Sequence, residues 1–415
     1  MSADRKFVPP QLLDDIEDVE AYRAGGFHPV SIGDYFAQGR YRILHKLGYG
    51  GSSTVWLARD QGGTQSGRLV TLKVVRADAS DIRNPALTIP GILQAANPSC
   101  SGIQTVDHHF FVKGPNGSHL VLASQFAGPS ILAMSDCPGR VFGSKRLRAD
   151  LARKVAKQVA TALHYMHSAG VVHGDTDVYA NLEEPQTEEV RTLGGLPCPP
   201  CAPRELVAPV DNNKITDPSF LEESVILADF GQSFVATSRP PNYEPATHPN
   251  YLPPEVRFEG RTSFEADVWA LGCAIFEIRA GFPLFSSFFG SDSDILRQTV
   301  ETLGRLPDPW WRQFERRASW FEDNGEPKSI QDQESAGVTL HASKSSLREQ
   351  LRSIGTQDDA PWYNEGAMIE KPGVRLCEKE VCLLGDLLEK MLKYRPEDRI
   401  GMQEVIMHPW LETSD

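Results

Sequence analysis

The chain contains 415 residues, of which 40% are hydrophobic and 23% are charged, and its formal net charge at pH 7 is −13. This length supports one or two ordinary hydrophobic cores, and there is no apolar run of about 18 or more residues that could span a membrane. The negative charge argues against nonspecific binding to the phosphate backbone of nucleic acids. It is compatible with a basic peptide substrate, because complementary charge speeds encounter.

The start of the chain is polar and acidic, and it lacks the basic segment and apolar core of a secretory signal. Among the seven cysteines, only Cys198 and Cys201 have a metal-like spacing. One such pair cannot complete a four-ligand zinc site, so we interpret them as two free thiols in a Pro-rich loop. A reducing compartment fits this pattern, and we expect an intracellular protein of the cytoplasm, the nucleus or both.

The first part of the chain reads as a lead-in followed by a small lobe. Residues 1–35 are a polar lead-in, in which a short helix around Leu12 to Arg23 is one option. Residues 36–126 are expected to form a β-rich lobe that ends in a hinge at Gln125 to Gly128. Its strands are expected at Tyr41–Leu47, Thr54–Arg59, Leu69–Val75 and His119–Gln125.

Two features of this lobe indicate a nucleotide site. A glycine-rich turn reads LGYGGSSTV at residues 47–55, and Lys73 follows within VTLKV at residues 70–74. Glycines let a hairpin backbone lie close over a triphosphate, and a strand lysine neutralises phosphate oxygens. The candidate nucleotide-binding residues are Leu47, Gly48, Gly50, Gly51, Ser53, Val55 and Lys73.

The rest of the chain, residues 127–411, is predicted to be a larger helical lobe, with 412–415 as a tail. A helix from about Arg148 to Ala169 is indicated by apolar residues at three- or four-residue steps, namely Leu151, Val155, Val159, Leu163 and Met166. Loop inserts are expected at about 182–225 and 323–359. The first is rich in Pro, Glu and Thr, a composition that predicts a loop or disorder rather than a packed element.

Five further motifs occur in the order and rough spacing of a eukaryotic protein kinase. They are HGD at 173–175, DFG at 229–231, LPPE at 252–255, DVWALG at 267–272 and RPEDR at 395–399. The resemblance covers roughly residues 41–411. It implies an α+β, bilobal fold with a small β-rich N-lobe of five antiparallel strands and one irregular helix, and a larger α-helical C-lobe.

More specific motifs narrow the family. GGFHPV at 25–30 and Gly33-Asp34 precede the glycine-rich turn, which contains Ser53-Thr54-Val55-Trp56, and LPDPWW follows at 306–311. Together they resemble the serine/arginine-rich protein kinase family, in its fungal branch. The resemblance implies a monomeric serine/threonine kinase that uses ATP and Mg²⁺. It implies protein substrates, Arg/Ser-rich ones being one option, and no direct contact with nucleic acid or membrane.

The resemblance also implies roles for individual residues. Asp175 would accept or orient the proton of the substrate hydroxyl, and Lys73 would grip the α and β phosphates. Asp229 and Asn181 would hold magnesium. The backbone carbonyl of Gln125 and the N–H of Ala127 would hold adenine. At the gatekeeper position the small side chain of Ser124 would leave the back of the adenine pocket open.

The sequence departs from the family pattern in three places. Residues 82–106 contain no acidic side chain, so the helical glutamate that should pair with Lys73 is missing, and Pro85, Pro90 and Gly91 favour only a poor helix. Ile89 or its neighbours occupy the expected place. We expect Lys73 to approach Asp229 instead, with Asp78 or Asp81 as the alternative partners.

The other two departures lie beside the catalytic aspartate. Asp177 stands where a lysine is expected, which places a negative charge near the γ-phosphate. The magnesium asparagine is expected at Ala180 but occurs one residue later, at Asn181. We expect each loss to cost a few kcal/mol of transition-state stabilisation, where about 1.4 kcal/mol is a factor of ten in rate.

Three functions therefore remain open. The first is a protein kinase of reduced activity, and the second is a nucleotide-binding or inactive pseudokinase that acts as an interaction scaffold. The third, a small-molecule kinase, shares the His-Gly-Asp loop but lacks support from the Pro-Pro-Glu and Asp-Val-Trp motifs. Since Gly174 cannot pair with a phosphate as arginine does, we also expect that phosphorylation of Thr237, Ser238 or Thr247 is not needed for an active arrangement.

Overall fold

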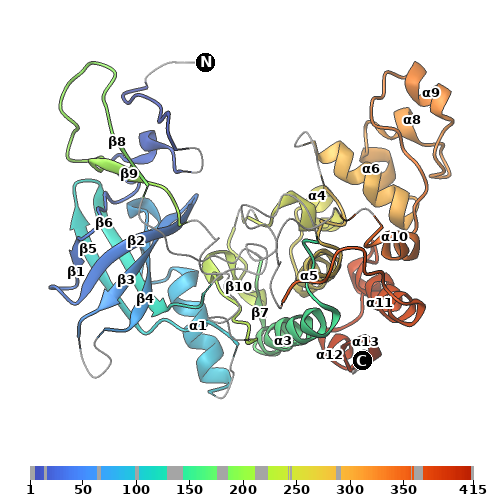
Figure 1. Ribbon diagram of the computed structural model, residues 1–415, viewed down its shortest axis with the longest axis horizontal. Helices are drawn as coiled ribbons and strands as arrows, with labels where there is room; N and C mark the ends of the chain where they lie inside the picture. Colours follow the sequence, from blue (N-terminus) through green and yellow to red (C-terminus); the bar gives the residue numbers. More distant parts are fainter. Residues whose placement is uncertain are drawn as a thin grey trace. The chain divides into compact units, whose positions relative to one another are not determined.

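The computed structural model describes the chain except for residues 1–4, 14–15, 63–66, 99–101, 129–143, 175–185, 211–222, 242, 244, 287–290, 357, 359–367 and 413–415. The chain divides into two compact units (Figure 1). The β unit contains residues 1–138, 177–221 and 226–231, and the helical unit contains 139–176, 222–225 and 232–415. None of the described helices is both long and apolar enough to cross a membrane.

The β unit is built on an antiparallel sheet that has six strands among the described residues, in the order β1-β2-β3-β4-β6-β5. The sequence predicted five strands, and the additional one is the two-residue β1, which pairs with the start of β2. The predicted strand at 69–75 is found with the same bounds. The strands are β1 (Tyr35–Phe36), β2 (Tyr41–Gly50), β3 (Ser53–Asp60), β4 (Leu69–Val75), β5 (His108–Gly114) and β6 (Gly117–Gln125).

Side-chain alternation in β4 explains how the sheet separates its core from its site. Val70, Leu72 and Val74 are buried in the main hydrophobic cluster of the sheet, together with Trp56 of β3. Because successive side chains of a strand point to opposite faces, Lys73 points away from that cluster. The register pairs Lys73 with Leu122 of β6. The lysine is thereby presented on the face of the sheet that lines a pocket.

The segment after β4 forms a regular helix, α1 (Pro85–Ala96), rather than the poor or irregular helix that its prolines predicted. The side chain of Asn84 accepts a hydrogen bond from the N–H of Ala86 at 2.9 Å, and Pro85 occupies the first helical position, where its missing N–H costs nothing. Burial of Ala86, Ile89 and Leu93 on one face offsets the hydrogen bond that Pro90 removes.

Residues 186–210, the main described part of the first insert, are packed, which corrects the prediction of a loop or disorder for that part. Strands β8 (Thr187–Glu189) and β9 (Glu205–Val207) pair antiparallel. They lie beside the lead-in, where the predicted helix is reduced to the single 3-10 turn η1 (Val19–Ala21) (Figure 1). Apolar residues of the two segments share one cluster, made of Phe7, Leu13, Val19, Tyr22, Phe27, Val190, Ala202 and Leu206. Composition understated the order of the insert because its apolar partners lie far away in sequence.

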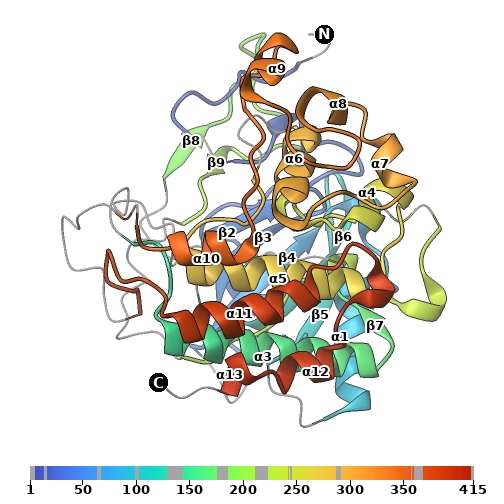
Figure 2. The ribbon, with the colours of Figure 1, turned by 90° about the vertical axis from the view of Figure 1, so that its right-hand side faces the viewer.

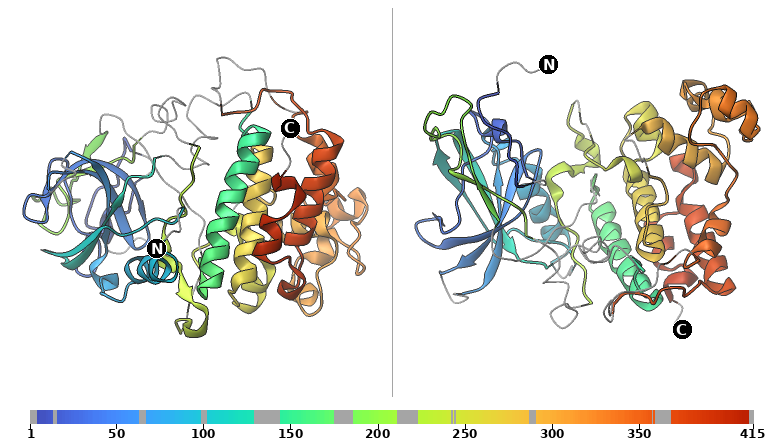
Figure 3. Two further views of the ribbon diagram at one scale, coloured as in Figure 1. Left: turned by 90° about the horizontal axis from the view of Figure 1, so that it is seen from below. Right: turned by 45° about the horizontal axis from the view of Figure 1, so that its top comes forward.

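The helical unit contains α3 (Ala149–Ser168), which confirms the predicted helix within one residue at each end, although Val159 is only half-buried. Helices α3, α5 (Phe264–Ala280) and α11 (Glu378–Met391) run side by side (Figures 2 and 3). Two-residue strands β7 (Val171–Val172) and β10 (Phe234–Val235) pair antiparallel. The remaining helices are α4 (Pro254–Glu259), α6 (Asp292–Leu303), α7 (Trp310–Gln313), α8 (Arg317–Trp320), α9 (Ile330–Ser335), α10 (Leu347–Ser353), α12 (Met402–Ile406) and α13 (Pro409–Glu412).

Helices α9 and α10 correct the prediction of a loop insert at 323–359. The side chain of Ser346 caps α10 in a capping box with Glu349. Gln333 of α9 is fully buried, and its side chain exchanges hydrogen bonds with the backbone of Ala342 at 2.7 and 3.1 Å. Polar side chains of this stretch therefore cap its helices and form hydrogen bonds within it.

Candidate nucleotide and catalytic site

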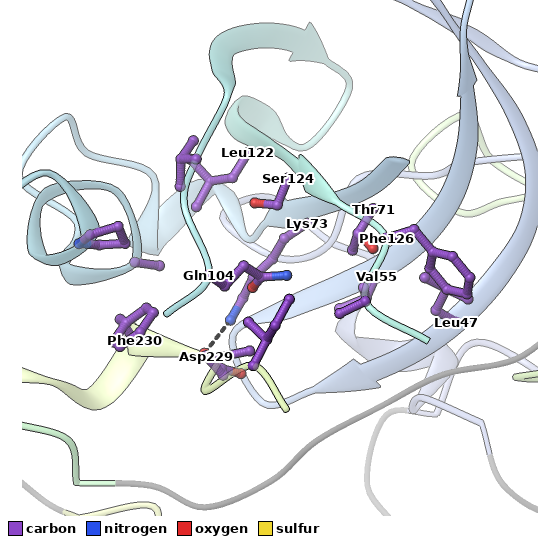
Figure 4. A pocket seen from close by; sticks show the side chains of 16 residues that line it. Leu47, Val55, Thr71, Lys73, Gln104, Leu122, Ser124, Phe126, Asp229 and Phe230 are labelled. Atoms are coloured by element: carbon purple, nitrogen blue, oxygen red, sulfur yellow. Dashed lines mark hydrogen bonds and ion pairs between the residues drawn. The ribbon is translucent and has the colours of Figure 1, made fainter. Parts of the chain in front are cut away.

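A cavity in the β unit gathers the sequence-predicted nucleotide residues. Leu47, Val55, Lys73 and Asp229 line it, with Phe126 from the hinge (Figure 4). The enclosed space of the cavity is about 100 Å³. Its apolar walls with a few polar and charged side chains are of the kind that line small-molecule sites.

The ammonium group of Lys73 lies 2.6 Å from the Oδ1 atom of Asp229. This ion pair, drawn as a dashed line in Figure 4, confirms the expected approach of the two residues. Asp229 has a positive φ of 59°, and the N–H of Gly231 donates to its Oδ1 atom at 3.1 Å. The side chains are 18% and 32% exposed, so both charges remain accessible to a ligand.

Backbone pairing fixes the segment that leads into Asp229. The N–H of Gln104 donates to the carbonyl of Leu227 at 2.9 Å, and the N–H of Leu227 donates to the carbonyl of Gly102 at 2.8 Å. Leu227 is thus held as a short strand-like bridge with residues 102–104. This bridge presents Asp229 at the edge of the pocket.

Helix α1 contributes no carboxylate to Lys73. It lines the pocket with Ala86 and Pro90, which are four residues apart and so share a helix face. The two alternative carboxylates pair elsewhere: Asp78 lies 2.7 Å from the guanidinium of Arg76, and Asp81 lies 2.8 Å from that of Arg83. The alternative that Asp78 or Asp81 takes the place of the missing glutamate is therefore wrong.

The glycine-rich turn joins β2 to β3. Gly50 pairs with Ser53 across the turn, and Gly48 pairs with Val55 after a register irregularity. A Cβ atom built on Gly50 or Gly51 would meet no protein atom within 4 Å. The backbone of the turn is therefore open on that side, as required of a loop that must lie close to phosphates.

The hinge residues follow directly from β6. Gln125 is the last residue of β6, and Ala127 is exposed two residues later. The side-chain amide of Gln104 donates to the carbonyl of Gln125 at 3.5 Å, which is a long contact. The carbonyl assigned to adenine therefore retains capacity to accept a second hydrogen bond.

His173 and Gly174, the described residues of the predicted catalytic loop, lie in the helical unit and are held by Asp267 of α5. The carboxylate of Asp267 accepts from the N–H of His173 at 2.9 Å and from that of Gly174 at 3.2 Å. Ser233 donates its hydroxyl to the carbonyl of His173 at 2.8 Å. Asp175, Asp177, Ala180 and Asn181 lie outside the described residues.

A second anchor joins the two remaining motifs of this unit. Arg399 donates to both carboxylate oxygens of Glu255, at 2.6 and 2.7 Å, and both side chains are completely buried. Its guanidinium also lies 5.0 Å from the ring centroid of Trp269. Paired in this way, a buried arginine and glutamate are tolerable where either one alone would not be.

Comparison with known proteins agrees with this arrangement. The family model described as protein kinase domain matches residues 216–411. A serine/threonine-protein kinase SRPK of Physarum polycephalum is 26% identical over 424 residues, which cover 95% of this chain and 91% of the relative. The chain is similar to proteins of the serine/arginine-rich protein kinase family.

Two further relatives match a shorter stretch of this kinase. Protein kinase dsk1 of Schizosaccharomyces pombe is 33% identical over 166 residues, 38% of this chain and 29% of the relative. SRSF protein kinase 3 of Homo sapiens is 32% identical over 170 residues, 38% of this chain and 28% of the relative. The predicted bilobal α+β kinase fold is likewise confirmed, since the kinase domain accompanies a β-rich unit and a helical unit.

The residues of the pocket suit ATP with Mg²⁺. An ammonium group beside a carboxylate offers one charge to phosphate oxygens and the other to a hard cation that prefers oxygen ligands. The open side of Gly50 and Gly51 leaves room for phosphates. For this kinase the donor set fits the nucleotide and its metal ion.

Sequence reasoning did not find every residue of the pocket. Ala86, Pro90, Gln104 and Val106 also line it. The sequence marks Pro90 only as a residue that disfavours a helix, and nothing in it distinguishes Ala86, Gln104 or Val106 as residues of a pocket. Gln104 reaches the pocket because residues 102–104 pair with Leu227, and Ala86 and Pro90 reach it because residues 85–96 form a helix despite their prolines.

Proposed function

We propose that the chain transfers the γ-phosphate of ATP to serine and threonine hydroxyls of protein substrates, including Arg/Ser-rich ones. The observation that carries the proposal is the 2.6 Å pair of Lys73 and Asp229 in a pocket closed by Leu47 and Val55 of the glycine-rich hairpin. Phosphoryl transfer depends mainly on positioning and charge neutralisation, and this pair supplies both charges.

Each group has a distinct task. Lys73 binds the α and β phosphates, and Leu47, Val55 and Phe126 exclude water from the faces of adenine. Asp229 and Asn181 would hold Mg²⁺, which would supply positive charge beside the phosphate oxygens. The carbonyl of Gln125 and the N–H of Ala127 orient the base. The backbone of Gly48, Gly50, Gly51 and Ser53 covers the phosphates.

Asp175 is assigned the proton of the substrate hydroxyl. The backbone before it is anchored, because Asp267 binds the N–H groups of His173 and Gly174 and Ser233 binds the carbonyl of His173. Such an anchor supports a carboxylate whose position must be reproducible to a few tenths of an ångström. The described geometry of the preceding residues is thus consistent with a catalytic loop.

Activation without phosphorylation is part of the proposal. The hydroxyl of Thr247 donates to the carbonyl of Gly174 at 3.0 Å, so this threonine supports the catalytic loop in its unmodified form. Gly174 has a φ of 76° and no side chain that could bind a phosphate. We further propose a monomeric enzyme of the cytoplasm, the nucleus or both, with no direct contact to nucleic acid.

The alternative is a pseudokinase scaffold, and one observation favours it. Helix α1 presents Ala86 and Pro90 to Lys73 in place of a glutamate, so the lysine depends on Asp229 for orientation. An inactive member would still bind nucleotide through the same pocket. The two functions therefore differ in turnover rather than in ligand.

A radiolabelled phosphate assay on an Arg/Ser-repeat peptide tests the proposal, with Asp229→Ala as the matched control. We expect incorporation by the wild-type protein and none by the variant. A thermal shift with Mg-ATP runs in parallel. A thermal shift without phosphate incorporation would support the scaffold. If neither a thermal shift nor incorporation were seen, the protein would not be a nucleotide-binding protein.

A further inference from the structure

A groove of the β unit, which we call the edge groove, is separate from the nucleotide pocket. Its volume is about 680 Å³, and its lining residues do not overlap with those of the pocket. One wall is formed by residues 34–38, which include β1, and the other by residues 108 and 110–113 of β5. His28 and Arg40 complete the lining. The groove is therefore a second concave surface, built entirely within the β unit.

The edge groove follows the two edges of the sheet. Strands β1 and β5 stand at opposite ends of the strand order, yet they line the same groove and lie beside each other in Figure 1. Successive side chains of a strand point to opposite faces, so a groove lined by residues 110–113 in succession runs along the edge of β5. Within the described part of the chain β5 pairs only with β6. Its outer edge therefore presents unpaired backbone N–H and C=O groups.

Aromatic side chains bridge and flank the gap between the two edges. The hydroxyl of Tyr41 on β2 shares a hydrogen bond with Nδ1 of His108 at 3.1 Å, and its ring stacks on that of Phe110 with the centroids 5.9 Å apart. Tyr35 and Phe111 line the opposite walls and are 57% and 46% exposed. These two rings offer an apolar contact surface to a further aromatic side chain.

The charges beside the edge groove are mainly positive. Lys113 lines it, Arg42 is exposed beside β1, and neither forms an ion pair with another described residue. Arg40 also lines it, but its guanidinium lies 2.9 Å from the carboxylate of Asp60, which offsets its charge. Asp34 is the one acidic residue among the described lining. In a chain of net charge −13, this surface is therefore a local site of attraction for acidic groups.

We propose that the edge groove binds an extended segment of a partner protein, which adds to β5 as a further strand and carries an aromatic side chain beside acidic residues. The unpaired backbone of β5 selects the extended conformation, because an added strand gains its affinity from main-chain hydrogen bonds. Tyr35 and Phe111 select the aromatic side chain, and Lys113 and Arg42 select the acidic residues. The same cations disfavour an Arg/Ser-rich segment, so the partner differs in chemistry from the proposed substrate.

A phage-displayed library of random peptides, selected on the full wild-type chain, tests the proposal. We expect the enriched peptides to combine aromatic residues with Asp or Glu, and their synthetic versions are titrated by fluorescence anisotropy. Lys113→Glu should weaken their binding at least about tenfold, because attraction becomes repulsion, and Phe111→Ala should do the same through the lost ring contact. Lys6→Glu reverses a charge on the exposed lead-in and is the matched control, with unchanged binding.

Methylation of backbone nitrogens in the best peptide tests strand addition itself. Alternate N–H groups of an added strand face its neighbour, and the others face away. Methylation of one alternate set should therefore weaken binding at least about tenfold more than methylation of the other set. Equal effects of the two sets would overturn strand addition to β5.

The remaining outcomes separate the groove from the kinase function. Enrichment of Arg-rich peptides alone, with binding unaffected by Lys113→Glu and Phe111→Ala, would overturn the proposal and leave the proposed function intact. A library without any enriched peptide would overturn it as well. A dimer in sedimentation that both variants dissociate would assign the groove to a second copy of the chain instead of a partner. Both changes lie at exposed positions on β5, and the methylated peptides decide on the wild-type chain alone.

Discussion

The ammonium group of Lys46 donates a hydrogen bond to the carboxylate of Glu17, and the two side chains are 0% and 2% exposed. The same carboxylate accepts from the hydroxyl of Tyr22 at 2.5 Å, and burial raises the pKa of that hydroxyl well above its ordinary value, with the charge of Glu17 adding to the effect. Lys46 directly precedes Leu47 of the pocket. The N–H of Val210 donates to the carbonyl of Lys46 at 3.2 Å. Glu17 of the lead-in and Val210 of the insert therefore both bind Lys46, beside the glycine-rich turn.

Breaking this buried pair should destabilise the β unit. Glu17→Gln keeps an acceptor for Tyr22 but leaves the ammonium group of Lys46 without its carboxylate, and removal of one partner of a buried pair costs about 3–5 kcal/mol. We expect a clear fall of the thermal midpoint. Lys46→Met should have a similar effect, and the double variant should cost less than the two single changes added together. Additive losses would show that the two residues do not act as a pair.

Restoring a carboxylate on α1 should raise turnover. Pro90 lines the pocket beside Lys73, so Pro90→Glu offers the lysine a second acidic partner. A gain of about 1.4 kcal/mol in transition-state stabilisation corresponds to a tenfold rise in kcat. Pro90→Gln is the control, because both variants remove the helix-breaking proline and only one adds the charge. Equal kcat in the two variants on an Arg/Ser peptide would contradict the charge effect.

The residue two positions after the catalytic aspartate offers an independent change. Asp177 places a negative charge where the family has a lysine, and a carboxylate near the γ-phosphate repels the group being transferred. Asp177→Lys should raise turnover about tenfold or more, and Asp177→Asn should give a smaller rise. Asp175→Ala should abolish activity and spare ATP binding. Rates unaffected by either change at 177 would place that carboxylate away from the nucleotide.

Stability should fall in mild acid because of a half-buried histidine, His28. Burial, with a smaller contribution from the nearby His119, lowers the pKa of His28 from 6.5 to about 4. Protonation is therefore disfavoured in the folded chain, so the stability from neutral His28 is full above about pH 6.5 and is lost as the pH falls toward 4. At about 1.4 kcal/mol for each pH unit between the two pKa values, the loss approaches about 3 kcal/mol.

This effect can be measured as the change in the thermal midpoint between about pH 7.5 and about pH 4.5. The range extends to either side of the ordinary histidine pKa of about 6.5. His28→Phe should flatten the profile, since the substitution removes the group whose proton uptake differs between the folded and unfolded chain. His109 is exposed on β5 and provides the control variant, His109→Gln, with a profile like the wild type. A His28→Phe profile as steep as that of the wild type would assign the pH dependence to other groups.

Local pattern was sufficient for much of the fold. The strand predicted at residues 69–75 is β4 with the same bounds, and the three- or four-residue spacing from Leu151 to Met166 predicted α3. Each of these elements buries one face, and the apolar residues of that face lie close enough together in the sequence to form a recognisable pattern. The two-residue β1 carries no such signal and forms only because β2 offers it a partner.

The remaining features could not be predicted from the sequence, because they depend on contacts between residues that are far apart along the chain. The order of the insert depends on apolar residues of the lead-in about 180 positions earlier, which composition cannot reveal. In the site, the pairing of Lys73 with Asp229 could be predicted because the family resemblance makes Asp229 the carboxylate nearest to this lysine. The contribution of Gln104 could not be predicted, since it depends on a backbone bridge to Leu227 rather than on a motif.

The packing of the lead-in against the first insert also determines when this kinase can complete its fold during synthesis on the ribosome. Val8 donates its N–H to the carbonyl of Arg191 at 2.8 Å, and Leu193 donates to that of Lys6 at 2.9 Å. Until residues near 193 have emerged, Phe7 and Tyr22 have no partner from the insert to cover them. Contacts of such high sequence separation form late, so the nascent chain presents an unfinished apolar surface while the whole sheet is already synthesised. A shortened chain that begins at residue 36 removes the lead-in and leaves Val190 and Leu206 exposed in the same way.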